Sequence, residues 1–112
     1  AKYYISELID SPIQLPEIRA KTESVYHLFV LRVKNRQNLL SYFLQDDIQA
    51  GVHYPVPVHL QPAYKGRITT AFDMSRTESL TKKIISLPIY PELTLSDAEK
   101  IVYVLKKFLN QT

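Results

Sequence analysis

The residues best suited to chemistry lie in one run, HYPVPVHLQPAY, between positions 53 and 64. It carries two imidazoles, two phenols and one amide: His53, His59, Tyr54, Tyr64 and Gln61. Three prolines separate them, and each fixes its own φ and favours an extended conformation in the preceding residue. Because a stiff segment loses little entropy on binding, the run predicts a loop that holds polar groups ready for a ligand. The alternative is that the prolines only shape a turn and that the histidines bond to the backbone.

This run does not have the pattern of a metal site or of a catalytic constellation. His53 and His59 are six positions apart outside any predicted helix, and no third ligand lies close to them in sequence. Zinc requires three or four convergent ligands. The chain has no cysteine and only two glycines, which excludes thiol catalysis, disulfides and a glycine-rich phosphate loop. We therefore predict no metal site and no catalytic residue in this chain.

Length and composition indicate a single globular domain over residues 1–112, with 46% hydrophobic and 22% charged residues. The net charge of +3 is spread along the chain, so nucleic acid is not expected, although the pI of 9.1 leaves a basic nucleic-acid-binding domain as one alternative. No run approaches the ~20 apolar residues of a membrane span, and no signal peptide is visible. We predict a cytoplasmic protein that does not contact the membrane.

Apolar periodicity predicts four helices and three strands. Residues 1–9 form a first helix that begins without a capping residue, which suggests that it extends upstream. Residues 25–33 are apolar on both faces and predict a central strand covered on both sides, with His27 as a buried, hydrogen-bonded core histidine. Asn35 is the expected N-cap of the next helix. The tyrosines at helix or strand positions are expected to pack in the core: Tyr3, Tyr4, Tyr26, Tyr42 and Tyr103.

The second half of the chain continues the alternation of strands and helices. Residues 49–54 and 84–89 predict two further strands, separated by a loop over residues 58–73. The pairs Ser75–Glu78 and Ser96–Glu99 have the spacing of capping boxes that open two more helices, so Glu78 is expected to cap its own helix. The order of elements predicts an α/β fold in which helices cover a small, mostly antiparallel sheet.

Four strings together resemble the C-terminal third of the DegT/StrS-type, pyridoxal-phosphate-dependent nucleotide-sugar aminotransferases. They occur in the order of that family and span nearly the whole chain: HLFVLRV followed by Arg36, then GVHYPVPVHLQPAY, then Thr77-Glu78, then SLPIYPELT. The second and fourth strings are specific in combination. The chain departs from the family at Ser75, where a proline is common, and at residues 65–70, which replace a glycine-containing stretch. These departures affect the conformation of the loop.

The resemblance implies a homodimeric parent protein with the aspartate-aminotransferase fold, of which this chain is the small C-terminal domain. Such enzymes move an amino group, usually from glutamate, onto a keto group of a nucleotide-linked deoxysugar. The cofactor is held as a Schiff base by a lysine and acts as an electron sink. That lysine belongs to the large domain of the family, and Lys65, Lys82 and Lys83 lack its sequence context. We therefore expect this chain alone to be inactive.

By the same resemblance, the run from 53 to 64 lies close to the mouth of the active site. His53, Tyr54 and His59 are then expected to contact the sugar or its diphosphate, with Gln61 and Tyr64 as additional candidates. An imidazole beside a diphosphate could donate charge-assisted hydrogen bonds. The alternative function is a stand-alone, non-catalytic α/β module whose stiff loop binds a ligand or another protein.

Overall fold

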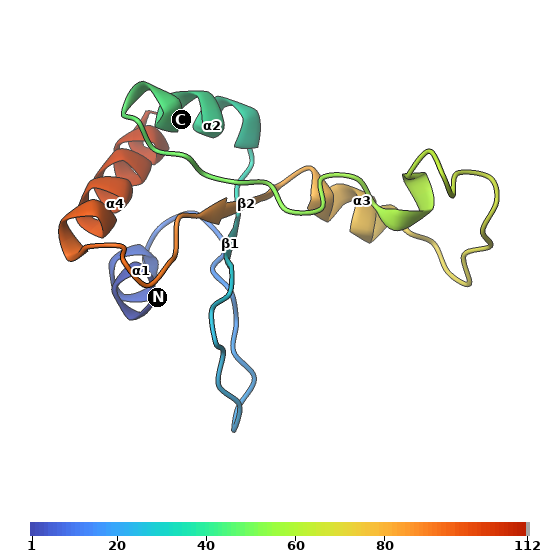
Figure 1. Ribbon diagram of the computed structural model, residues 1–112, viewed down its shortest axis with the longest axis horizontal. Coiled ribbons are helices and arrows are strands. Elements are labelled where there is room, and N and C mark those ends of the chain that lie inside the picture. Colours follow the sequence, from blue (N-terminus) through green and yellow to red (C-terminus); the bar gives the residue numbers. More distant parts are fainter. Residues whose placement is uncertain (112) are drawn as a thin grey trace.

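The computed structural model describes residues 1–111. Its elements are α1 (Lys2–Leu8), β1 (Phe29–Arg32), α2 (Arg36–Gln45), the 3-10 helix η1 (Val58–Leu60), α3 (Ser75–Thr81), β2 (Ile84–Leu87) and α4 (Leu95–Asn110). Figure 1 shows α1, α2 and α4 gathered to one side of the two strands. Two segments project from this body: an extended loop, residues 16–28, and an arm, residues 54–82, that carries η1 and α3.

The sheet is small and antiparallel, as predicted. β1 pairs with β2 from Phe29 opposite Leu87 to Arg32 opposite Ile84. An isolated bridge adds Gln14 beside Arg32, on the free edge of β1. A second isolated bridge adds Gly51 beside Ser86, on the free edge of β2. Four segments distant in sequence therefore lie side by side, and the outer two are held only at one position each.

The core lies between this sheet and the three helices of the body. The long helix α4 turns one face inward, and α1 and α2 pack against it. Its buried residues are Ala98, Ile101, Val102, Val104, Leu105 and Phe108. The ring of Tyr4 lies 5.1 Å from that of Phe29, and its hydroxyl donates to the Pro88 carbonyl at 2.9 Å. Burial of a hydroxyl is tolerated there because it has a partner.

The predicted strand over residues 25–33 is wrong in its first half, because β1 begins only at Phe29. Tyr26 has a φ of +47°, a left-handed conformation that interrupts a regular strand. Its amide donates to the Ser24 hydroxyl, which is a local turn contact. His27 is exposed, so the expectation of a buried core histidine is also wrong. Tyr103 likewise lies on the exposed face of α4 and not in the core.

The predicted strand over residues 49–54 is reduced to the single bridge at Gly51. Two causes act directly after it: Tyr54 has a φ of +58°, and the two prolines that follow have no amide hydrogen for a ladder. The capping predictions are shifted as well. The N-cap of α3 is Met74, and that of α4 is Thr94, whose hydroxyl accepts from the Asp97 amide at 3.1 Å. Asn35 does precede α2, although its side chain makes no capping bond.

Substitutions of two leucines of α2 test the position of the hydrophobic core. Leu39 is fully buried and Leu44 is 63% exposed. Leu39→Ala is expected to lower the free energy of unfolding by about 2–5 kcal/mol, because it removes apolar contact and leaves a cavity. Leu44→Ala makes the same chemical change at the surface and is expected to cost less than about 1 kcal/mol. Urea unfolding followed by circular dichroism measures both, and equal losses would contradict the placement of the core.

Because of Tyr4, the free energy of unfolding is expected to depend on pH in the alkaline range. Burial raises the pKa of Tyr4 far above its ordinary value of 10.0, since a buried phenolate would lose its hydration. When the pH rises above about 10, the unfolded chain releases this proton while the folded chain keeps it. The folded state then binds more protons, so the free energy of unfolding is expected to fall as the pH increases from about 10 upward.

The variant Tyr4→Phe removes this titration and is expected to flatten the decline between about pH 9 and 11 in a series of urea unfolding curves. Because it also removes the hydrogen bond to Pro88, the slopes are compared and not the absolute stabilities. The matched control is Tyr103→Phe, which removes an exposed phenol. A change of slope as large in that control would contradict the role of burial.

Candidate functional site

A groove of about 560 Å³ opens beside the sheet, where β2 ends and the chain continues toward α4. Its apolar wall comes from the end of β2 and from α4, through Leu87, Ile89 and Ile101. Polar side chains reach it from several segments, among them those of His27, Asp47, His53, Ser86 and Lys100. A concave, partly apolar surface with a few convergent polar groups is the usual form of a small-molecule site.

His53 is held at this groove by Ser86. The Nδ1 atom of the imidazole lies 2.8 Å from the Ser86 hydroxyl oxygen, and Ser86 is a buried polar residue of β2. The bridge at Gly51 brings the two residues together, because it fixes the chain beside β2 two residues before His53. A Cβ atom at position 51 would lie 3.0 Å from the Cε1 atom of the His53 ring. The glycine therefore leaves room for the ring.

Charges of both signs surround the rest of the groove. Asp47, which has a φ of +58°, and Asp97 contribute carboxylates, and Lys100 contributes an ammonium group. The Asp97 carboxylate accepts a 2.5 Å hydrogen bond from the Thr94 hydroxyl at the start of α4. That carboxylate therefore serves the helix terminus, where a negative charge is favourable. The groove is thus mixed in charge and does not select anions.

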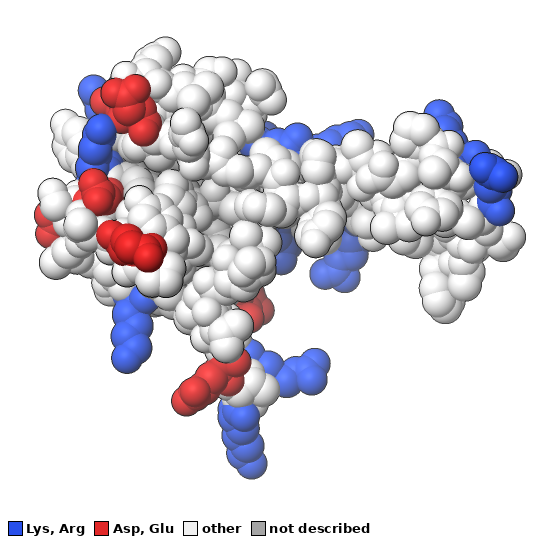
Figure 2. All heavy atoms as spheres, viewed as in Figure 1, with Lys and Arg blue, Asp and Glu red and all other residues white. Residues whose placement is uncertain are grey.

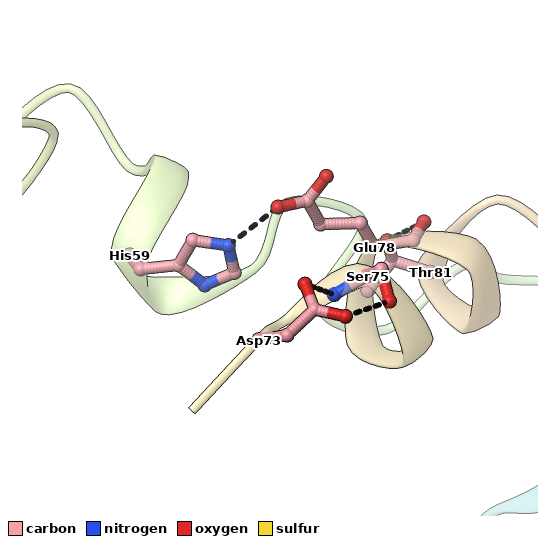
Figure 3. A network of polar contacts seen from close by, with 5 residues as sticks. All are labelled: His59, Asp73, Ser75, Glu78 and Thr81. Atoms are coloured by element: carbon pink, nitrogen blue, oxygen red, sulfur yellow. Dashed lines mark hydrogen bonds and ion pairs between the residues drawn. The ribbon is translucent and has the colours of Figure 1, made fainter. Parts of the chain in front are cut away.

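The second histidine of the run is held in a different way, on the arm. The Nε2 atom of His59 lies 3.0 Å from the Oε1 atom of Glu78, so η1 is tied to α3 (Figure 3). Glu78 therefore contacts an imidazole and is not the helix cap that the sequence predicted. The side chain that bonds to the first turn of α3 is instead that of Asp73, which accepts from both the hydroxyl and the amide of Ser75. These bonds, that from the hydroxyl first, lower the pKa of the Asp73 carboxyl.

The five residues predicted for substrate binding do not converge on one cavity. Of the five, His53 lines the groove, and the other four lie on the arm. Tyr54, three residues after the last bridge to the sheet, is exposed, and so is Tyr64. The Gln61 amide donates to the Val56 carbonyl at 3.2 Å, which braces the arm internally. In Figure 2 the visible face of the arm carries basic but no acidic side chains, and its tip is basic.

Sequence reasoning missed Ser86 and Lys100 as groove residues. Ser86 is the lone hydroxyl of an otherwise apolar strand, and a buried hydroxyl needs a partner, so this signal was available. Lys100 gave no signal, because an exposed lysine on a helix face is ordinary. Among residues 1–111, no group of three or more histidine, aspartate or glutamate side chains could hold a metal ion. Within the same residues, no helix is long and apolar enough to cross a bilayer.

Pyridoxal phosphate does not fit the part of the chain that the structure describes. The cofactor needs a lysine amine at its ring and hydrogen-bond donors around its phosphate. Lys65 and Lys82 lie on the arm, away from the groove. Lys100 lines the groove beside two carboxylates, which would repel a phosphate group. These residues therefore do not by themselves supply the chemistry of this cofactor.

The contact between His53 and the sheet depends on the space left at Gly51. Gly51→Ala is expected to push the imidazole away from Ser86 by a few tenths of an ångström or more, and so to shift the His53 ring signals in NMR spectra. Gly66→Ala is the matched control, because no atom lies within 4 Å of its added methyl group. Its φ of +71° makes the control cost about 1 kcal/mol of stability without moving His53. Unchanged His53 signals in Gly51→Ala would refute this arrangement.

Comparison with known proteins relates the chain to one family. The model of the DegT/DnrJ/EryC1/StrS aminotransferase family matches residues 1–106. The erythromycin biosynthesis sensory transduction protein EryC1 of Saccharopolyspora erythraea is 40% identical over 107 residues, which are 95% of this chain and 29% of that protein. The dTDP-3-amino-3,4,6-trideoxy-alpha-D-glucose transaminase of Streptomyces venezuelae is 37% identical over 109 residues, which are 96% of this chain and 29% of that protein.

The solved structures agree with this relationship. The crystal structure of S. venezuelae DesV in complex with a ketimine intermediate matches with a TM-score of 0.92 and 35% identity, over 99% of this chain and 30% of that chain. This match confirms the predicted α/β fold as part of an aminotransferase architecture. The chain spans about 29% of the length of the curated relatives it matches. With a family match over nearly all of its residues, the chain belongs to the DegT/DnrJ/EryC1/StrS aminotransferase family.

Proposed function

We propose that these residues form one domain, residues 1–112, of a pyridoxal-phosphate-dependent aminotransferase that acts on a nucleotide-linked keto-deoxysugar. The amino donor in this proposal is glutamate, and the lysine that binds the cofactor belongs to another part of the parent protein. The observation that carries the proposal is the family match over residues 1–106. It is supported by a relative that is named as a transaminase of a dTDP-linked amino sugar.

In this proposal the chain supplies one wall of the substrate site. His53 and Tyr54 directly follow the last bridge to the sheet, and His53 already borders a groove. A substrate bound at the base of the arm would meet His53 and Tyr54. His59, Gln61 and Tyr64 would contact the part of the substrate that extends along the arm. The chemistry itself is supplied by the cofactor, and this wall binds and orients the sugar nucleotide.

The alternative of a stand-alone binding module is not favoured, because two relatives that are named as transaminases of dTDP-linked amino sugars match nearly the whole chain. A cytoplasmic location and a homodimeric parent protein are further parts of the proposal. The exposed apolar side chains of the arm, among them Val58, Ile68 and Phe72, suit a segment that packs against other parts of such an assembly. Contact with nucleic acid or a membrane is not part of the proposal.

The full-length enzyme provides the test. His53→Ala and Tyr54→Ala are each expected to lower kcat/KM for the nucleotide sugar about 3- to 10-fold, because one hydrogen bond contributes about 0.5–1.5 kcal/mol. Tyr103→Ala removes an exposed tyrosine of α4 that has no place in the site, and it is expected to keep the wild-type kinetics. Steady-state kinetics with the sugar nucleotide varied at saturating glutamate measure all three. Wild-type kinetics in His53→Ala would remove that residue from the site.

Whether cofactor binding requires another part of the parent protein can be measured separately. The isolated chain mixed with pyridoxal phosphate is expected to show no absorption band of bound cofactor, whereas the full-length enzyme shows one. A band from the isolated chain would mean that one of its own lysines binds the cofactor.

A further inference from the structure

The contact between His59 and Glu78 joins the two helices of the arm, η1 and α3. The two residues are 19 positions apart, on η1 and α3, and their side chains meet at 3.0 Å. The His59 side chain is only 12% exposed, whereas that of Glu78 is 41% exposed. The imidazole is therefore largely enclosed, and its orientation is set by one directional contact (Figure 3). Neither the capping role predicted for Glu78 nor the proposed function explains this contact.

The chemistry of Glu78 determines which ring nitrogen carries the hydrogen. An ionised carboxylate can only accept hydrogen bonds, so the Nε2 atom of His59 must be the donor. In a neutral imidazole one nitrogen carries the hydrogen and the other has a free lone pair. Nε2–H donating to Glu78 thus leaves Nδ1 as an acceptor. Figure 3 shows this second nitrogen pointing away from Glu78.

The Nδ1 atom of His59 keeps some exposure to solvent. Among residues 1–111 no hydrogen bond involves it, and no side-chain nitrogen or oxygen of these residues is both buried and without a partner. Nδ1 must therefore retain access to water, even though most of the ring is covered. An accessible lone pair on an enclosed, oriented ring is a preorganised acceptor for a ligand that donates a hydrogen bond.

A nucleotide sugar offers two kinds of group to such a nitrogen. The oxygens of an ionised diphosphate only accept hydrogen bonds, so they would meet the Nδ1 lone pair with repulsion. A sugar hydroxyl can donate. We propose that Glu78 is a positioning residue, which holds His59 in the Nε2–H form so that Nδ1 accepts a hydrogen bond from a sugar hydroxyl and does not bind the diphosphate. The identity of the ligand rests on the proposed function, whereas the Nε2–H form rests only on the geometry of the arm.

The tautomer can be measured on this chain by long-range 1H–15N NMR of the histidine rings at pH 7.5. The expected result for His59 is a neutral ring protonated on Nε2. Glu78→Gln is expected to weaken this preference, because the amide can accept from Nε2–H or donate to a bare Nε2, and Glu78→Ala is expected to abolish it. Glu7→Gln is the matched control, since Glu7 is equally exposed, at 40%, and forms a 2.8 Å ion pair with Lys106 on the body. A wild-type ring protonated on Nδ1, or on both nitrogens, overturns the proposal.

Kinetics of the full-length enzyme test the ligand. Glu78→Ala is expected to raise KM for the nucleotide sugar about 3- to 10-fold with little change in kcat, and Glu78→Gln is expected to have a smaller effect, because its amide still contacts the ring but admits both tautomers. With analogues that each lack one sugar hydroxyl, the penalty of Glu78→Ala is expected to disappear for one analogue only. A penalty that persists with every analogue overturns the assignment. So does an equal loss of affinity for the nucleoside diphosphate without its sugar, because the contact would then be to the diphosphate.

Failures of the two proposals can be told apart. If the full-length enzyme transaminates no nucleotide sugar, the proposed function and the hydroxyl assignment both fail, while the NMR result still decides whether Glu78 positions His59. If the enzyme transaminates a nucleotide sugar but His59 is not in the Nε2–H form, the proposed function stands and the role of Glu78 is refuted.

Discussion

The reciprocal backbone hydrogen bonds between Gly51 and Ser86 join the arm to the sheet, and the positions of both histidines in the run depend on them. The two N···O distances are 2.9 and 2.8 Å. Pairing at Gly51 brings His53 to the Ser86 hydroxyl. Beyond this point the chain cannot extend the ladder, because Tyr54 has a positive φ and two prolines follow it. The chain therefore leaves the sheet, and residues 54–82 project as an arm (Figure 1).

The body and the arm are stabilised in different ways. The body has a buried apolar core, and α4 supplies much of it. The arm exposes large apolar side chains, and its own contacts are polar ones: His59 with Glu78, and Gln61 with the Val56 carbonyl. Elements with few buried apolar contacts open at lower free energy than a core does. His53 is thus attached to the rigid part of the molecule, whereas His59 depends on the arm keeping its shape.

The sequence predicted the elements that local periodicity specifies. Residues 1–9 and the final helix show apolar stripes at helical spacing, and the structure places Tyr4, Leu8, Leu105 and Phe108 of these helices in the core. The capping error occurs where a residue distant in sequence determines the contact that a side chain makes. The pair Ser75–Glu78 has the spacing of a capping box, but Asp73 bonds to Ser75 and Glu78 turns to an imidazole 19 residues away. No local pattern contains that partner. The shorter β1 has a local cause instead, because the left-handed φ of Tyr26 and its contact with Ser24 keep the residues before Phe29 out of the strand.

The two imidazoles of one stiff run consequently differ in what they can offer a ligand. The partner of His53 is a hydroxyl, which can donate or accept, so either tautomer of His53 keeps its bond to Ser86. The partner of His59 is a carboxylate, which only accepts, so one tautomer is selected. His53 can therefore adapt to a donor or an acceptor with its free nitrogen, and His59 discriminates between them. Residues that look equivalent in the sequence acquire distinct roles because the chain between them passes from the sheet to the arm.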